Sequence, residues 1–143
     1  MAVFPGERPV IVQPLALGVD LGTSGLRLSL LDREGTLLAC HSSAYPLPFA
    51  QPEGWRLGLM TLLQRLPLEQ RAAIGALALD GTSGTLLLCD AQGRPQGQAL
   101  PYHQACTEQQ SRLSTLVPES QVAASSSSSL ARALRLLDNA GPP

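Results

Sequence analysis

Apolar and polar positions alternate through the first third of the chain in the way that a half-buried sheet requires. Leu15 to Asp20 is a short apolar run that ends in a carboxylate, and Leu26 to Leu31 alternates leucine with Arg27 and Ser29. A period of two places every second side chain on one face of a strand. With Thr36 to Ser43 following a glycine-containing turn, the pattern predicts a three-stranded antiparallel meander.

Further along, the apolar spacing changes to three or four residues, which is typical of a helix that covers a sheet. This spacing predicts a helix from about Pro52 to Leu66, stopped by Pro67. The remaining segments are predicted to be short strands at Ile74 to Asp80, Thr85 to Cys89 and Ala99 to Tyr102, and helices at Thr107 to Leu116 and Leu130 to Leu137. Strand, helix, strand order after the meander predicts a parallel partner and therefore a mixed α/β sheet. Residues 1–14 are predicted to be a flexible leader, and residues 15–143 a single structural unit.

One motif occurs twice, each time after an apolar strand. Asp20 to Gly25 reads D-L-G-T-S-G and leads into a strand and then Asp32-x-x-Gly35. Sixty residues later Asp80 to Gly84 reads D-G-T-S-G and leads into Asp90-x-x-Gly93. Two copies are too few for a solenoid, which needs at least about three stacked units. We interpret them as two turns built with the same chemistry.

Each turn offers the groups that handle phosphates and polyols. Glycines allow positive φ and close approach of a ligand to the backbone. Successive N–H groups form an anion-binding nest, and the threonine and serine hydroxyls donate or accept hydrogen bonds. A carboxylate at the strand end suits a hydrated Mg²⁺ or a sugar hydroxyl. The same letters also form ordinary turns in which the aspartate accepts local N–H groups, so this simpler interpretation stays open.

Composition removes several classes of function. The 143 residues are 44% hydrophobic and carry a net charge of −1, which gives no basic surface for nucleic acid or anionic lipid. All ten cations are arginine, so a Schiff-base lysine and a P-loop lysine are excluded. Three unpatterned cysteines and an opening that does not resemble a signal peptide indicate a cytoplasmic protein, or one of the plastid stroma if the source is a plant. No apolar run approaches the roughly 18 residues of a membrane span.

Other conspicuous residues receive structural interpretations. Trp55 is expected to anchor a helix while half-buried, and Ser129 or a neighbour in the serine run is expected to cap the last helix. Arg132 and Arg135 are expected on a solvated helix face, and Cys89 is expected to be an inert thiol in the core.

The segment LGVDLGTSGLRLSLLD resembles the first phosphate motif of the actin-like ATPase superfamily, and in particular of the FGGY carbohydrate kinases. The second segment, ALALDGTSGTLLLCDAQGRPQGQALPYHQA, resembles the FGGY stretch that ends in an aromatic element, here Leu100 to Gln104. Within the family the chain is similar to the cyanobacterial and plant D-ribulokinases described as xylulokinase-like. The resemblance implies a ribonuclease H-like α/β fold of which this chain forms the N-terminal part of domain I.

The resemblance also implies roles for individual residues. Asp20 would lie near the transferred phosphate, the sugar and Mg²⁺, while Gly22, Thr23 and Ser24 would face the phosphates of ATP. Ser83 would contact a pentulose. The implied reaction phosphorylates D-ribulose to D-ribulose 5-phosphate, with ATP and Mg²⁺ as cofactors.

The chain departs from the family in two places. Xylulokinases tend to carry Met-His where this chain has Thr82-Ser83, which speaks against D-xylulose. His103-Gln104 replaces a common Asn-Asp pair. The family's general base and its adenosine-binding segments would lie beyond residue 143, in a missing C-terminal half of the kinase, so no catalytic base is assigned here. The alternatives are another FGGY polyol kinase, and an inactive remnant or sugar-binding fragment.

Overall fold

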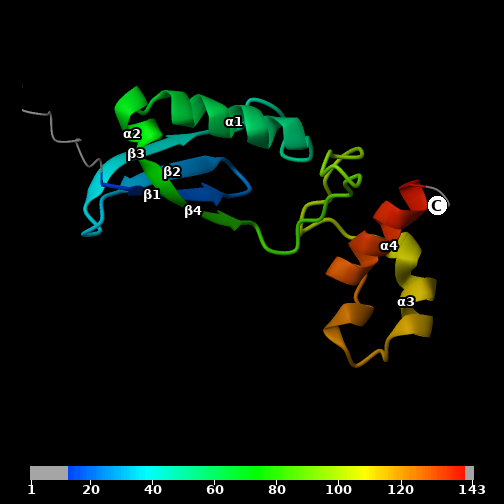
Figure 1. Cartoon of the computed structure of the whole chain (residues 1–143). Helices are drawn as coiled ribbons and strands as arrows, with labels where there is room; N and C mark the ends of the chain where they lie inside the picture. Colours follow the sequence, from blue (N-terminus) through cyan, green and yellow to red (C-terminus); the bar gives the residue numbers. More distant parts are fainter. Residues whose placement is uncertain (1–12, 141–143) are drawn as a thin grey trace, which may run out of the picture.

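A mixed four-stranded sheet forms the first half of the protein in the computed structural model, which describes residues 13–140. The predicted leader lies almost wholly outside the described residues. The strands run in the order β3-β2-β1-β4, with β1 to β3 antiparallel and β4 parallel to β1 (Figure 1). Their bounds are β1 Leu15–Leu21, β2 Leu26–Leu31, β3 Leu37–Ser43 and β4 Ile74–Gly81. The predicted meander, its parallel fourth strand and the α/β fold class are confirmed.

One face of the sheet carries the main core, as the period of two predicts. Leu17 and Val19 of β1 lie in register with Leu30 and Leu28 of β2, and all four are buried. Helix α1 (Pro52–Gln64) covers this face, and the predicted helix over this segment is confirmed (Figure 1). Gly58 permits the close packing, because a Cβ there would lie 2.8 Å from a methyl carbon of Leu26.

A second, helical part follows the sheet and has its own core (Figure 1). It contains a 3-10 turn η1 (Thr107–Gln109), α3 (Gln110–Leu116), a second 3-10 turn η2 (Val122–Ala124) and α4 (Ser129–Ala140). The two helices predicted for this region are confirmed. Its fully buried side chains include Cys106, Leu113 and Ala131.

Three expectations about local structure are wrong. The segments 85–89 and 99–102 are not strands, because they form only isolated bridges: Leu86 pairs with Leu100, and Cys89 pairs with Pro95 in the intervening loop. Cys89 therefore has no sheet to bury it and is exposed. The pattern also missed α2 (Leu68–Ala72), a five-residue helix without buried residues between Pro67 and β4.

Between residues 13 and 140 no helix is long and apolar enough to cross a bilayer.

Candidate functional site

The first turn, D-L-G-T-S-G, joins β1 to β2 and brings opposite charges together. Asp20 and Arg27 are cross-strand partners, and the Arg27 guanidinium donates to Asp20 Oδ2 over 2.8 Å. The two side chains are 43% and 68% exposed, so the pair adds little stability but sets the local charge. The expected positive φ is wrong for this turn, because Gly22 and Gly25 do not have it. Gly25 is needed for space: a Cβ there would lie 2.5 Å from the Ser43 carbonyl oxygen.

Tyr45 supports this turn from the loop after β3. Its hydroxyl donates to the Gly22 carbonyl oxygen over 2.8 Å, and its ring packs against Phe49. Partial burial, and next the negative charge of Asp20, raise the pKa of the Tyr45 hydroxyl above its usual 10.0. The phenol therefore stays protonated and keeps donating throughout the neutral range.

The second turn is attached directly to the end of β1. Asp80 of β4 is the register partner of Asp20, so both carboxylates lie side by side at the carboxyl ends of parallel strands. Beyond them, the Thr82 amide and the Thr82 hydroxyl both donate to the Leu21 carbonyl oxygen over 3.2 Å. The Asp80 carboxylate accepts the N–H of Gly81, which is the local, structural use that the sequence left open.

Arg132 of α4 holds the other end of the second turn, and the expectation that it lies on a solvated face is wrong. It is only 3% exposed. Its guanidinium donates to the carbonyl oxygens of Gly84 (2.9 Å), Tyr102 (2.7 Å) and Ser127 (2.8 Å). Buried arginine is tolerated where its donors are satisfied, and carbonyl oxygens satisfy them here. Gly84 has φ +73°, and a Cβ there would lie 3.2 Å from the Arg132 Nη2 atom.

The two turns line one cavity of about 460 Å³. Every residue predicted for the site contributes to its wall, which consists of Asp20, Gly22, Thr23, Ser24, Arg27, Thr82, Ser83 and Tyr102. Asp20 and Arg27 also line an adjoining cavity of about 360 Å³ with Asp80. The juxtaposition of Asp20 with Ser83, on which the two-turn interpretation depends, is therefore present in the structure.

Sequence reasoning did not assign three residues that shape this cavity. Arg27 supplies the only cationic group in its wall, and the period of two already placed Arg27 on the same face as Asp20. Tyr102 adds an aromatic ring, 48% exposed, from the element after the second turn. No pattern in the sequence indicated the support given by Arg132, because that contact joins residues 48 positions apart.

The cavity suits a metal that is shared with a substrate. In the described part of the chain no group of three His, Cys, Asp or Glu side chains could hold a metal ion alone. Mg²⁺ usually binds through one or two carboxylates together with substrate phosphates and water. Asp20 and its neighbour Asp80 supply carboxylates of that kind, and Arg27 occupies one oxygen of Asp20. The residues present therefore fit Mg²⁺ only in company with a phosphate ligand.

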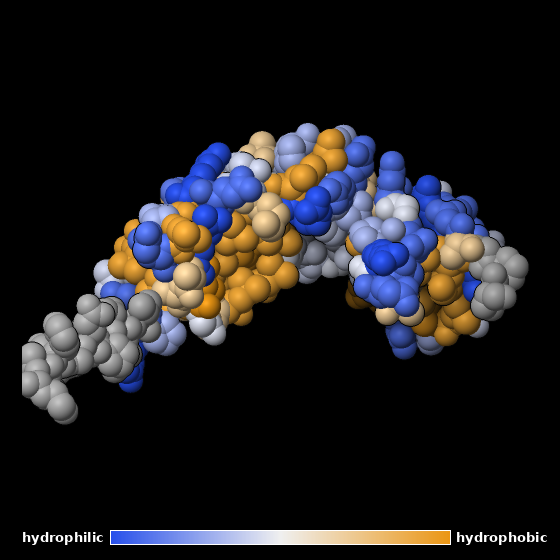
Figure 2. Space-filling model, turned by 45° about the horizontal axis from the view of Figure 1, so that its top comes forward, coloured by the Kyte–Doolittle hydropathy of each residue, from blue (hydrophilic) through white to orange (hydrophobic). Residues whose placement is uncertain are grey.

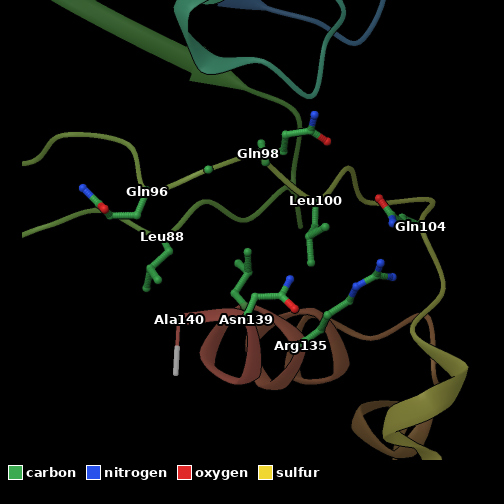
Figure 3. Close-up of a pocket in the computed structure, with 11 residues that line it drawn as sticks. Leu88, Gln96, Gln98, Leu100, Gln104, Arg135, Asn139 and Ala140 are labelled. Carbon is green, nitrogen blue, oxygen red and sulfur yellow. The ribbon is translucent and has the colours of Figure 1, made fainter. Parts of the chain in front are cut away.

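A larger cavity of about 510 Å³ lies away from both turns, between the 88–104 segment and α4 (Figure 3). Figure 3 shows Gln96 and Gln104 on one side and Arg135 and Asn139 of α4 on the other. None of the predicted site residues contributes to it. Trp55 lines a fourth, smaller cavity of about 140 Å³. It is half-buried, and its indole N–H donates to the Phe49 carbonyl oxygen, as expected of a helix anchor.

Solved structures with a similar fold include two xylulose kinases and a glycerol kinase. A xylulose kinase from Brucella ovis superposes with a TM-score of 0.59 and 22% identity, over 71% of this chain and 24% of that one. A xylulose kinase from Bifidobacterium adolescentis gives 0.58 and 19% identity, over 78% and 23%. Plasmodium falciparum glycerol kinase with ADP gives 0.55 and 12% identity, over 76% and 24%. No protein-family model matches the chain.

These likenesses define the class of fold. The chain has the mixed α/β fold with flanking helices that the sequence predicts and that these kinases share, and it spans about a quarter of the length of the solved kinases. It therefore corresponds to part of a domain in those proteins. At these identities the comparison concerns the fold, and the chemistry has to be argued from the cavity between the two turns.

Proposed function

We propose that this chain is the N-terminal part of an ATP-dependent FGGY sugar kinase that phosphorylates a pentulose, with D-ribulose as the favoured substrate. One observation carries the proposal: Asp20, Thr23 and Ser24 share a cavity with Ser83 and Tyr102. A phosphate-binding turn and a polyol-binding turn must meet at one place if a phosphoryl group is to pass between their ligands.

The first turn is proposed to hold the phosphates of ATP. Its small residues leave the backbone accessible, and Thr23 and Ser24 offer hydroxyl donors. Arg27 supplies the positive charge that a triphosphate needs beside the carboxylate of Asp20. Mg²⁺ bound with the nucleotide would neutralise the charge that develops during transfer, and Asp20 is the residue proposed to hold it.

The second turn is proposed to hold the sugar. The Ser83 hydroxyl is proposed to donate a hydrogen bond to a polyol hydroxyl and to accept one from it. The exposed ring of Tyr102 offers an apolar surface to the C–H face of a sugar. In the reaction the oxygen of the C5 hydroxyl would form a bond to the γ-phosphorus while the bond to the β-phosphate oxygen breaks and ADP leaves. The hydroxyl proton needs a base, and none of the aspartates in this chain is assigned that role.

The proposal is tested by separating binding from turnover. In calorimetric titrations we expect the 143-residue chain to bind D-ribulose more tightly than D-xylulose or glycerol, and Ser83→Ala to weaken the binding about tenfold, which is the value of one hydrogen bond. Ser127→Ala is the matched control outside the cavity. We expect no ADP release from Mg-ATP and D-ribulose, because none of the aspartates of this chain is proposed as the base.

Each contrary result selects another hypothesis. Preference for D-xylulose or glycerol would indicate a different FGGY polyol kinase. Binding of no sugar would indicate an inactive remnant. Substantial ADP release would contradict the assignment of the base to a region beyond residue 143.

A further inference from the structure

Arg132 donates hydrogen bonds to both segments that carry the proposed sugar-binding groups. Figure 2 shows hydrophilic side chains gathered on the helical part, at the right of the view, whereas Arg132 of this part is only 3% exposed. Its Nε–H donates to the carbonyl oxygen of Gly84, the residue after Ser83, over 2.9 Å. Its Nη1 donates to the carbonyl oxygen of Tyr102 over 2.7 Å. A single guanidinium therefore touches the backbone beside Ser83 and the backbone of Tyr102.

The same guanidinium is fixed by the chain around the start of α4. Nη1 also donates to the carbonyl oxygens of Ser127 (2.8 Å) and Gln104 (3.3 Å), and Nη2 donates to the Ser129 hydroxyl over 3.5 Å. A buried guanidinium with its donors satisfied in this way cannot swing out without leaving several polar groups unpaired. It is therefore a fixed point to which the two sugar-side segments are attached.

Gly84 shows how closely the second turn fits against this point. Its φ is +73°, and an added Cβ would lie 3.2 Å from Arg132 Nη2 and 3.5 Å from the Tyr102 Cβ. The second turn, α4 and the Tyr102 segment thus meet without space for a further side chain. The first turn is held by other contacts, which Gly25 and Tyr45 make near the sheet.

We propose that Arg132 is a positioning residue for the sugar: its planar guanidinium fixes the spacing at which Ser83 and Tyr102 both contact one pentulose. This inference rests on the proposed function, which places the sugar between these two residues. The residues that line the 460 Å³ cavity do not include Arg132, so it acts through the two residues that it holds. A guanidinium is a rigid fork with fixed donor directions, whereas the ammonium of lysine is a point charge on a flexible stem.

Arg132→Lys tests the proposal, because it keeps the charge and removes the fork. In calorimetric titrations of the 143-residue chain, we expect the affinity for D-ribulose to fall about tenfold, which corresponds to the loss of one hydrogen bond. The affinity for Mg-ATP should change by less than about twofold, because the first turn is held without Arg132. Arg135→Lys is the matched control on the same helix, at the ion pair with Glu108, and should leave both affinities unchanged.

The spectrum of the unliganded protein reports on the geometry itself. In ¹H–¹⁵N spectra, Arg132→Lys should shift the amides of Ser83 and Tyr102 and leave those of Gly22 to Ser24 in place. Equal losses of affinity for D-ribulose and Mg-ATP would indicate general destabilisation and overturn the proposal. If the wild type binds D-ribulose and Arg132→Lys binds it equally well, only this inference fails. If the wild type binds no sugar, the proposed function fails with it.

The wild-type chain provides a measurement that does not require a variant to fold. The Arg132 Nε–H is hydrogen-bonded to the Gly84 carbonyl, and its exchange with water requires this contact to open. D-ribulose at about 100 times its Kd should slow this exchange up to about 100-fold, because the opened state no longer holds Ser83 and Tyr102 at the binding distance. Mg-ATP should leave the exchange rate unchanged. An exchange rate that bound D-ribulose does not alter would overturn the proposal.

Discussion

The two turns, D-L-G-T-S-G and D-G-T-S-G, have nearly the same sequence but are held in place by different contacts. The first is fixed locally: Gly25 fits against the backbone of β3 with no room for a Cβ, and Tyr45 ties Gly22 to the loop that follows. The second is fixed from a distance. Gly84 adopts positive φ, and its carbonyl is held by Arg132, which lies 48 residues later in α4.

This difference shows that a repeated motif specifies chemistry more closely than it specifies conformation. The first turn needs only the antiparallel meander, whose contacts are near in sequence. The second turn depends on the packing of the helical part against the 84–104 segment. We therefore expect the second turn to unfold at a lower urea concentration than the first.

Removing Arg132 should have the largest effect. Arg132→Met keeps a similar apolar stem but leaves the carbonyls of Gly84, Tyr102 and Ser127 without their donor. We expect the free energy of unfolding, measured in urea, to fall by roughly 3 kcal/mol. Arg135→Met, one turn along the same helix at a partly exposed ion pair, should cost less than about 1 kcal/mol. Equal losses for the two variants would contradict the role given to Arg132.

Asparagine substitutions distinguish the two reasons why glycine is required, which are positive φ at Gly84 and lack of space for a side chain at Gly25. Asn adopts positive φ more readily than other residues with a side chain, so Gly84→Asn should cost only about 1 kcal/mol. Gly25→Asn must displace the Ser43 backbone, which a Cβ would approach to 2.5 Å, and should cost about 2 kcal/mol or more. The two losses are compared by urea denaturation of both variants. A larger loss for Gly84→Asn than for Gly25→Asn would contradict the reasons given for the two glycines.

Tyr45→Phe removes one hydrogen bond to the first turn and should lower the free energy of unfolding by about 1 kcal/mol. The folded pKa of Tyr45 is raised, so its contribution is complete below pH 10.0, the unfolded value, and is lost as the pH rises through the folded pKa. The wild type should therefore lose stability above pH 10 more steeply than Tyr45→Phe. Parallel curves for the two proteins up to alkaline pH would contradict this account.

Arg27→Met should have the smallest effect on stability, about 0.5 kcal/mol or less, because its ion pair with Asp20 is exposed. Its effect on nucleotide binding should be larger, since Arg27 is the only cation in the cavity wall. Calorimetric titration with Mg-ATP should show a loss of about tenfold in affinity. Unchanged affinity would remove Arg27 from the proposed phosphate site.

Periodicity predicted most of the elements, because a period of two or of three to four follows directly from burial on one side. It failed where burial does not follow the pattern. The 85–89 segment has the apolar residues of a strand but pairs only at isolated bridges outside the sheet, and Cys89 is exposed. Arg132 is a charged helix residue of the kind usually found on a solvated face, but it is buried and donates to the carbonyl oxygens of residues 84, 102 and 127. The cavity residues were predictable because each turn follows a strand and these two strands are parallel neighbours, so their carboxyl ends meet at one edge of the sheet.

The central claim is that the two turns form one site for a phosphate and a sugar. The most direct measurement is a pair of ¹H–¹⁵N NMR titrations of the 143-residue chain, one with Mg-ATP and one with D-ribulose. Mg-ATP should shift the amides of Gly22 to Ser24, and D-ribulose those of Ser83 and Tyr102, with each ligand also perturbing the Arg27 side chain between them. Saturating ligand that leaves both turns unchanged, or that moves only residues of the α4 cavity such as Asn139, would contradict the claim.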